Sequence, residues 1–196
     1  MSDADDIDSA TLLSLGERIR NLRIERELTL AALSARSQIS VGMLSHIERG
    51  RTSPSLKLLD RLRVALGVPL ASFFDVDTDR NAEQGTVTRQ GQRSTLLFSK
   101  TGLTKELLSP PGHPEMEFFM LSIAVGGGSG PDPWRRNGEK AGYVLQGRIE
   151  LRIGEQSHLL AEGDAFQFDS RQPHSFQNLA ETETKVIWII RSSEVG

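Results

Sequence analysis

The stretch Thr29–Ser55, TLAALSARSQISVGMLSHIERGRTSPS, predicts two short helices joined by a tight bend and followed by a basic turn. Thr29 and Ser40 suit helix starts, because a hydroxyl oxygen can accept a hydrogen bond from a backbone N–H of the first turn. Gly50 follows the second run and favours the left-handed backbone that ends many helices. We therefore expect one helix over Leu30–Arg36 and a second between Ser40 and Gly50.

The second of these helices has two chemically different sides. Leu44 and Ile47 fall together on one side, where they can pack against a core. Small, polar and cationic residues recur on the opposite side at helical spacing. Such a helix is suited to enter the major groove of DNA. The residues of this outer side are Gly42, Ser45, His46 and Arg49.

Three segments in and around this stretch resemble the XRE (phage-repressor-like) helix-turn-helix family. They are Gly16–Arg20, Leu28–Leu33 and Met43–Arg51, the last followed closely by Ser53–Pro54–Ser55. The resemblance covers about Leu13 to Phe74. It implies a DNA-binding domain of five short helices, which we assign to residues 14–74.

The resemblance also implies an ion pair inside this domain. In the family, an Arg at the position of Arg23 pairs with a Glu at the position of Glu48. We therefore expect a partly buried Arg23–Glu48 pair that sets the angle between two helices. Removing one partner would leave a buried charge uncompensated, which destabilises a domain.

Charge is unevenly distributed along the 196 residues. Residues 1–13 carry four Asp and no Lys or Arg, and we expect them to form a disordered acidic tail. Residues 14–74 carry ten Lys or Arg against five Asp or Glu, whereas residues 75–196 carry 13 against 17. A basic segment between acidic neighbours fits a DNA-binding module attached to a part that does not bind DNA.

The composition also argues against several classes of protein. The chain has no Cys, so it has no disulfide framework and no thiol chemistry. No apolar run approaches the ~20 residues of a membrane span, and the acidic N-terminus does not resemble a signal peptide. We expect a cytoplasmic protein without a membrane partner.

The sequence pattern changes after residue 74. Residues 75–93 are polar and lack a sustained apolar pattern, as in an inter-domain linker. Beyond them, short runs alternate between apolar and polar residues and are separated by glycines, which is typical of an antiparallel sandwich or barrel. Residues 186–190 are apolar on both sides, which indicates a buried strand.

Residues 94–192 resemble a small-barrel cupin, a closed antiparallel β-barrel. The resemblance covers about residues 95 to 191, and a helix-turn-helix, a linker and a cupin in this order form a common regulator architecture. We therefore expect a multidomain α + β chain, helical first and barrel second. The matching segments are Tyr143–Leu151, Glu162–Phe166, Pro173–Phe176 and Asn178.

The metal-ligand positions of this cupin have changed. Metal-binding cupins supply two His and a Glu from the first motif and a third His from the second. Here the first three positions hold Trp134, Arg136 and Lys140, and only His174 remains. Trp cannot ligate and cations repel a divalent ion. We expect no metal or other cofactor, although a shifted register would bring in Glu139.

Two alternatives remain open for the barrel. If the strand before Val144 is continuous, Arg136 and Lys140 point inward across from His174. With Trp134 beside them, they would bind an anionic small molecule such as a carboxylate. Alternatively, the segment 126–138 breaks the alternation, both cations reach solvent, and the barrel only dimerises.

The candidate DNA contacts follow from caps, charge and the outer side of the second helix. Helix caps and cations predict phosphate contacts, and the outer side predicts base contacts. The base-reading positions lack Arg, Asn and Gln, so we expect DNA shape to contribute more than usual. The phosphate candidates are Thr29, Ser40, Arg49, Arg51 and Lys57, and the base-reading candidates are Val41, Gly42, Ser45 and His46.

We interpret the chain as a dimeric transcription regulator, a repressor, whose cupin domain senses a small anionic metabolite. One recognition helix touches few base pairs, so such proteins bind as dimers to half-sites ~34 Å apart. The expected partners are double-stranded DNA, a small-molecule effector and a second copy of the chain. The alternatives are a constitutive DNA-binding protein with a ligand-free cupin and, disfavoured by the lost ligand positions, a cupin enzyme.

Overall fold

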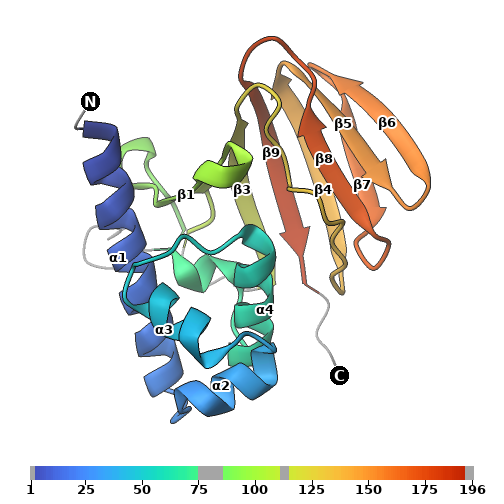
Figure 1. Cartoon of the computed structure of the whole chain (residues 1–196). Helices are drawn as coiled ribbons and strands as arrows, with labels where there is room; N and C mark the ends of the chain where they lie inside the picture. Colours follow the sequence, from blue (N-terminus) through green and yellow to red (C-terminus); the bar gives the residue numbers. More distant parts are fainter. Residues whose placement is uncertain (1–2, 75–85, 111–114, 193–196) are drawn as a thin grey trace. The chain divides into compact units, whose positions relative to one another are not determined.

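The structure, a computed structural model, describes residues 3–74, 86–110 and 115–192, with only the backbone described for residues 3–11. The chain divides into two compact units, Met1–Asp75 and Val76–Gly196. The first unit consists of helices and the second mainly of strands (Figure 1). Of the predicted linker, residues 75–85 lie outside the described residues.

The helical unit is built around apolar side chains from every helix. Ile19, Leu33, Leu44, Leu59 and Leu62 are almost fully buried at its centre. Because these residues come from four separate elements, the core fixes the helices against one another. In chain order the elements are α1 (Asp3–Ile24), α2 (Leu30–Ser37), α3 (Val41–Glu48), α4 (Leu56–Leu66) and a 3-10 helix, η1 (Leu70–Phe73).

The prediction of five helices was wrong in its last member. The described part of this unit holds four α-helices, and the expected fifth is the short 3-10 helix η1. Gly67 adopts the left-handed conformation with φ 65° and ends α4. Pro69 then precedes only four helical residues, too few for a stable α-helix, and tight i→i+3 turns are common in such short pieces.

The predicted caps of the central helices are present. The side chain of Thr29 accepts a hydrogen bond from the backbone N–H of Ala32, and that of Ser40 accepts one from Met43. The helix α3 ends at Glu48, two residues before Gly50. Gly50 has φ 63°, and its N–H donates to the carbonyl of Ile47 at 2.9 Å, as in a Schellman ending.

The N-terminal segment differs from the prediction. The sequence predicts a disordered tail over residues 1–13, whereas α1 already begins at Asp3. Acidic residues at the start of a segment, followed by Ala and Leu, are compatible with a helix N-terminus. The acidic residues, from which we expected disorder, are therefore also compatible with the first turns of a helix.

The second unit contains two antiparallel sheets. The larger has the strand order β1-β2-β3-β9-β4-β7 and the smaller has the order β6-β5-β8. Two 3-10 helices, η2 (Gln90–Gln92) and η3 (Ser99–Thr101), flank β1. The strands are β1 (Thr95–Phe98), β2 (Leu103–Leu107), β3 (Met116–Ile123), β4 (Glu139–Gln146), β5 (Arg148–Ile153), β6 (Gln156–Ala161), β7 (Ala165–Asp169), β8 (His174–Asn178) and β9 (Thr184–Arg191).

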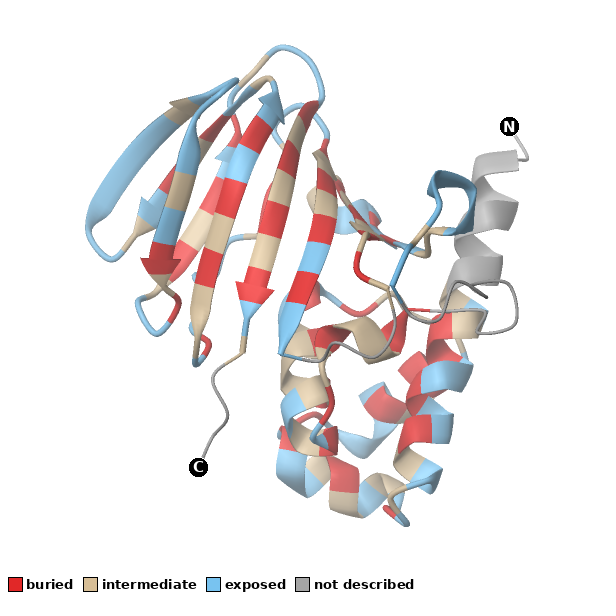
Figure 2. Ribbon diagram, turned by 180° about the vertical axis from the view of Figure 1, so that it is seen from behind, coloured by how far each residue is buried: buried red, intermediate tan, exposed pale blue. Residues whose placement is uncertain are grey.

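Burial alternates along most of these strands, as expected for sheets with one face packed inside (Figure 2). Phe119, Val144, Leu151 and Val186 are almost completely buried between the two sheets. This arrangement confirms the antiparallel, cupin-like architecture that the sequence predicts. The strand β9 lies between β3 and β4, at the centre of the larger sheet.

Candidate functional site

The helix α3 has the two sides that its sequence predicts. Leu44 and Ile47 are 0% and 1% exposed, and they anchor the helix in the core. Gly42, His46 and Arg49 are exposed on the other side, and Ser45 is half-buried. The structure thus leaves a small, polar and cationic surface facing solvent. Arg49 folds back on the helix, its Nε donating to the carbonyl of Ser45 at 3.0 Å.

Two apolar side chains add to this surface. Val41 and Met43 are 44% and 43% exposed at the start of α3. Val41 was among the predicted base-reading residues, but Met43 was not. An exposed apolar side chain on a groove-binding helix can contact the methyl group of thymine. Exposure in the folded domain is therefore the signal that adds Met43 to the candidates.

The phosphate candidates cluster at helix starts and at the connection between α3 and α4. Thr29 and Ser40 are exposed caps of α2 and α3, where backbone N–H groups point outward. Arg51 lies in the exposed connection, and Lys57 is exposed in the first turn of α4. Helix N-termini with nearby cations are suited to bind phosphate oxygens.

The predicted Arg23–Glu48 pair is present. Nε of Arg23 donates to Oε1 of Glu48 at 2.7 Å, and a second nitrogen donates to Oε2 at 2.8 Å. The two side chains are only 12% and 5% exposed, and Arg23 also donates to the carbonyl of Leu28. Hydrogen bonding to Glu48 raises the pKa of Arg23. This bidentate ion pair joins the end of α1 to the end of α3 and fixes the orientation of α3 relative to α1.

Gly16 brings α1 into close contact with the same end of α3. A Cβ atom at this position would lie 2.5 Å from the carbonyl oxygen of Ile47 and 2.9 Å from that of Glu48. Gly is therefore required here for close packing, although it is a poor helix former.

In the barrel, Arg136 and Lys140 are buried, at 8% and 3% exposure. The alternative in which both cations reach solvent therefore does not describe this structure. Lys140 lies on β4 and faces inward with Val144, as the alternation predicts. Arg136 precedes the strand, and its backbone N–H donates to the carbonyl of Ser170 at 2.8 Å. The inward positions of both cations thus do not require a continuous strand.

Arg136 lies in a polar network. One of its terminal nitrogens donates to Oε2 of Glu117 at 3.2 Å and to the hydroxyl of Ser192 at 2.7 Å. Glu117 is 1% exposed at the start of β3. Because a buried carboxylate needs a partner of opposite charge, this pair explains how both groups tolerate burial.

Lys140 and His174 are in direct contact. Nζ of Lys140 lies 2.6 Å from Nε2 of His174, while Nδ1 lies 2.8 Å from the carbonyl oxygen of Gln172. A carbonyl only accepts, so Nδ1 carries the hydrogen, and Nε2 of a neutral imidazole accepts from the lysine. Lys140 also lies 5.0 Å from the centre of the Trp134 ring and 5.8 Å from that of Trp188.

Trp134 belongs to the same cluster. Its backbone pairs directly with His174 through two hydrogen bonds of 2.8 and 2.9 Å, and the two rings lie 6.4 Å apart. The structure therefore brings Trp134, Lys140 and His174 together, whereas the side chain of Arg136 is held by Glu117 and Ser192.

These residues do not fit the metal of a cupin. The only His at a ligand position directs Nε2 to Lys140, so a cation already occupies the direction in which that nitrogen would bind a metal. Glu139, the alternative ligand, alternates with Lys140 and pairs with Arg191 at 3.0 Å instead. In the described residues, no group of three or more His, Cys, Asp or Glu is positioned to hold a metal ion.

Sequence reasoning missed two further charged residues inside the barrel. Lys105 on β2 is 2% exposed, with Nζ 3.8 Å from the centre of the Phe119 ring, and Glu117 is the partner of Arg136. Both occupy inward positions of alternating strands, which is the signal that would have identified them. With Arg136 and Lys140, the charged side chains buried in the described barrel comprise three cations and one carboxylate.

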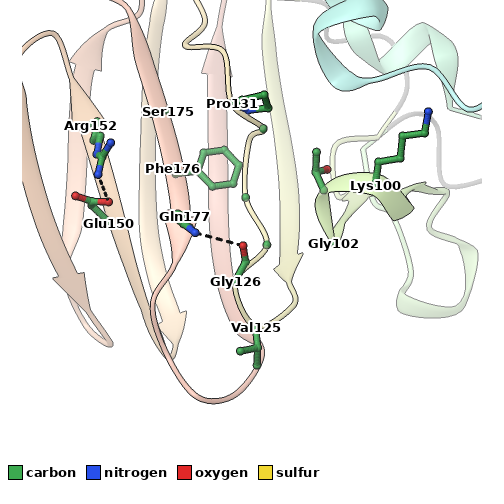
Figure 3. Close-up of a pocket in the computed structure, with 14 residues that line it drawn as sticks. Lys100, Gly102, Val125, Gly126, Pro131, Glu150, Arg152, Ser175, Phe176 and Gln177 are labelled. Carbon is green, nitrogen blue, oxygen red and sulfur yellow. Dashed lines mark hydrogen bonds and ion pairs between the residues drawn. The ribbon is translucent and has the colours of Figure 1, made fainter.

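A separate groove lies on the outside of the smaller sheet (Figure 3). It has a volume of about 540 Å³ and lies between η3, the segment 125–131 and outward residues of β5 and β8. Its walls are mostly polar: Glu150 pairs with Arg152 at 3.0 Å, and Gln177 donates to the carbonyl of Gly126 at 3.4 Å. None of the four predicted effector residues lines this groove.

Comparison with known proteins agrees with this two-part arrangement. The helix-turn-helix family model matches residues 19–73, and the cupin domain model matches residues 111–190. The HTH-type transcriptional regulator PuuR of Escherichia coli (strain K12) is 24% identical over 176 residues, 89% of this chain and 93% of PuuR. The transcriptional regulator ClgR of Mycobacterium tuberculosis is 36% identical over 75 residues, 38% of this chain and 67% of ClgR.

A crystal structure of an HTH_3 family transcriptional regulator from Vibrio cholerae has the same fold. It matches with a TM-score of 0.75 at 23% identity, covering 95% of this chain and 99% of that one. The chain therefore belongs to the XRE-family helix-turn-helix transcriptional regulators that carry a C-terminal cupin domain. It is a DNA-binding regulator of transcription. None of the helices in the described part of the chain has the length and hydropathy that a membrane crossing requires.

Proposed function

We propose that α3 reads bases in the major groove while the caps and cations around it hold the phosphates. The observation that carries this proposal is the division of α3, in which Leu44 and Ile47 are buried and the opposite side is exposed. Val41, Gly42, Ser45 and His46 are the proposed base readers. The phosphate contacts come from Thr29, Ser40, Arg49, Arg51 and Lys57. A regulator of this kind acts in the cytoplasm, where the DNA is.

The direct test is binding of the full chain to its own upstream promoter fragment at low ionic strength. We expect retardation of this fragment, and repression when the same promoter drives a reporter. A variant with His46→Ala and Ser45→Ala should keep non-specific binding but lose discrimination against scrambled DNA, because base contacts carry sequence information. If the wild-type protein does not retard the promoter fragment, the proposal is wrong.

We further propose that the cluster of Trp134, Arg136, Lys140 and His174 makes the barrel a sensor of a small anion. Three buried cations and one buried carboxylate favour an anionic ligand, since burial of like charges is costly. The ligand would meet the lysine beside His174 and the ring of Trp134, and would compete with Glu117 for Arg136. Binding of the anion would change the arrangement of the DNA-binding units. The coupling free energy between anion binding and DNA binding is typically ~1–3 kcal/mol in allosteric proteins.

The probe for this sensor is a panel of small carboxylates, such as acetate, pyruvate, succinate and citrate. We expect at least one to raise the melting temperature of the full chain and to change its affinity for the promoter. Lys140→Met should abolish this response, whereas Lys105→Met, which removes a buried cation near Phe119, should weaken it less. An unchanged response in a variant carrying both Arg136→Ala and Lys140→Ala would contradict the proposed site.

Two other functions compete with the sensor. A barrel that only dimerises would show no response to any carboxylate while the promoter is still bound. A metal-dependent cupin enzyme would need a bound ion, and the contact between Lys140 and His174 disfavours one. Metal analysis of the purified protein separates the enzyme from the other two. We expect no more bound transition metal than in a control protein that lacks a metal site.

A further inference from the structure

Aromatic rings surround the contact between Lys140 and His174 inside the barrel. They form a continuous series in which the centre of each ring lies 5.0 to 6.3 Å from that of the next. The His174 ring closes the series, because it lies 4.9 Å from the ring at one end and 6.4 Å from the ring at the other. We call the five carbon-rich rings the aromatic cluster, which in order consists of Trp134, Phe176, Trp188, Phe166 and Phe168.

The inward side of the barrel is accessible to solvent where β6 and β7 lie. These consecutive strands are edge strands of two different sheets, and β6 is exposed along most of its length (Figure 2). His158 on β6 pairs with the inward residue Leu151, and Phe166 on β7 pairs with the inward residue Gly142. Both side chains therefore point inward, yet His158 is exposed and Phe166 only half-buried. A small molecule from solvent can thus reach the ring of Phe166.

Gly142 allows the Phe166 ring to lie directly against β4. A Cβ atom at position 142 would lie 2.3 Å from Cζ of Phe166, so the ring fills the space that a side chain would take. Gly142 alternates with Lys140 and Val144 on the inward side of this strand. The accessible ring of Phe166 is therefore one inward position away from the amine of Lys140.

The charge of Lys140 decides which ligand this arrangement suits. Rings around a cation often recognise an ammonium ligand, but here the cation is part of the chain. Nζ of Lys140 lies 5.0 Å from the centre of the Trp134 ring and 5.8 Å from that of Trp188. A second cation would be repelled, and a neutral ligand would not offset the buried charge. An anion that carries a ring matches both the lysine and the rings beside it.

We propose that the barrel binds an aromatic carboxylate. Its carboxylate meets the amine of Lys140, and its ring packs against the accessible ring of Phe166. This inference rests on the proposed function, in which the same cluster senses a small anion, and it names the chemical class of that anion. Contacts between aromatic rings stabilise a complex beyond the burial of apolar area, so a saturated ring of the same size binds less tightly.

The test compares benzoate with cyclohexanecarboxylate by calorimetric titration of the full chain. The two probes have the same charge and the same number of carbon atoms, but only benzoate is aromatic. We expect benzoate to bind about 3- to 10-fold more tightly, as the usual strength of an aromatic pair implies. Phe166→Leu keeps an apolar side chain without a ring, and this variant should bind the two probes about equally.

Phe118→Leu is the matched control. Phe118 is 36% exposed on β3 and alternates with the buried Phe119, so it points away from the interior. This variant should keep the preference of the wild-type protein for benzoate. Lys140→Met should lose binding of both probes, because it lacks the amine that meets the carboxylate.

Three results would overturn the inference. The first is wild-type protein that binds cyclohexanecarboxylate as tightly as benzoate, a comparison that requires no variant to fold. The second is a preference for benzoate that persists in Phe166→Leu, which would place the ligand ring elsewhere. The third is unchanged affinity for benzoate in Lys140→Met.

Acetate and succinate distinguish failure of this inference from failure of the proposed sensor. If these aliphatic carboxylates bind in a manner that depends on Lys140 and benzoate does not bind, the sensor stands and its ligand is not aromatic. If no carboxylate of either kind binds, both the sensor and the aromatic ligand are wrong.

Discussion

Lys140 contacts His174 through the one ring nitrogen that a cupin histidine can offer to a metal: Nζ and Nε2 lie 2.6 Å apart. The ammonium thus takes the place of the ion. The backbone pairing of Trp134 with His174 shows that position 134 projects to the same side as the histidine ring.

Restoring ligands at these positions should restore a metal site. A variant carrying Trp134→His and Lys140→Glu has three ligands of the kinds that Zn²⁺ prefers and lacks the competing ammonium. We expect Zn²⁺ to raise the melting temperature of this variant and not that of the wild-type protein. Lys140→Glu alone, with two ligands, is the control and should respond weakly. Equal stabilisation of the wild-type protein by Zn²⁺ would show that Lys140 does not block the site.

The ion pair between Arg23 and Glu48 should be essential for stability of the helical unit. Arg23→Ala leaves the Glu48 carboxylate, 5% exposed, without its main partner, and we expect a loss of about 3 kcal/mol in the free energy of unfolding. The control is Arg63→Ala, since the carboxylate it leaves, Asp60, is 35% exposed. That loss should stay below about 1 kcal/mol. Urea unfolding followed by helical circular dichroism measures both, and equal losses would contradict the role of burial.

Two glycine substitutions in the helical unit should have opposite effects. Gly16→Ala would bring a methyl group within 2.5 Å of the Ile47 carbonyl, so α1 and α3 must separate and stability should fall. Gly42→Ala meets nothing within 4 Å, and the helix propensity of Ala should raise stability by up to ~1 kcal/mol. Thermal melts of the two variants test this directly. Stabilisation by Gly16→Ala would show that the helices tolerate a wider spacing.

Salt dependence should separate the two kinds of DNA contact. Lys57→Ala removes one proposed phosphate contact, so the slope of log affinity against log salt should become shallower by about one, uniformly across sequences. His46→Ala should leave the slope unchanged and relax specificity at one or two base pairs. Filter-binding titrations over a range of salt concentrations, with the operator and with altered sequences, measure the slope and the specificity. An unchanged slope for Lys57→Ala would remove that residue from the interface.

Local signals were sufficient to predict much of the helical unit. Thr29 and Ser40 cap helices through hydrogen bonds to residues three positions later in the chain. Capping interactions over such short separations can be predicted from sequence. The Arg23–Glu48 pair spans 25 residues and was expected only because the family resemblance implied it. The start of α1 at Asp3 was missed because the acidic composition suggested disorder.

The barrel site depended on contacts that sequence does not reveal. Arg136 reaches the interior because its backbone N–H bonds to Ser170, 34 residues away, across a segment whose alternation could not be followed. The partner of Arg136, Glu117, and the contact between Lys140 and His174 are likewise long-range. Parity predicted that Lys140 and Val144 share a face, but it could not show which groups would meet inside.

The chain has two tryptophans, Trp134 and Trp188, and both belong to the barrel, within 6 Å of the Lys140 amine. The helical unit has none. Indole emission from the unlabelled protein is therefore an optical reporter of the barrel interior alone. It can register a ligand that binds beside Lys140 while remaining insensitive to local changes around α3, so ligand occupancy of the barrel can be followed while DNA is present.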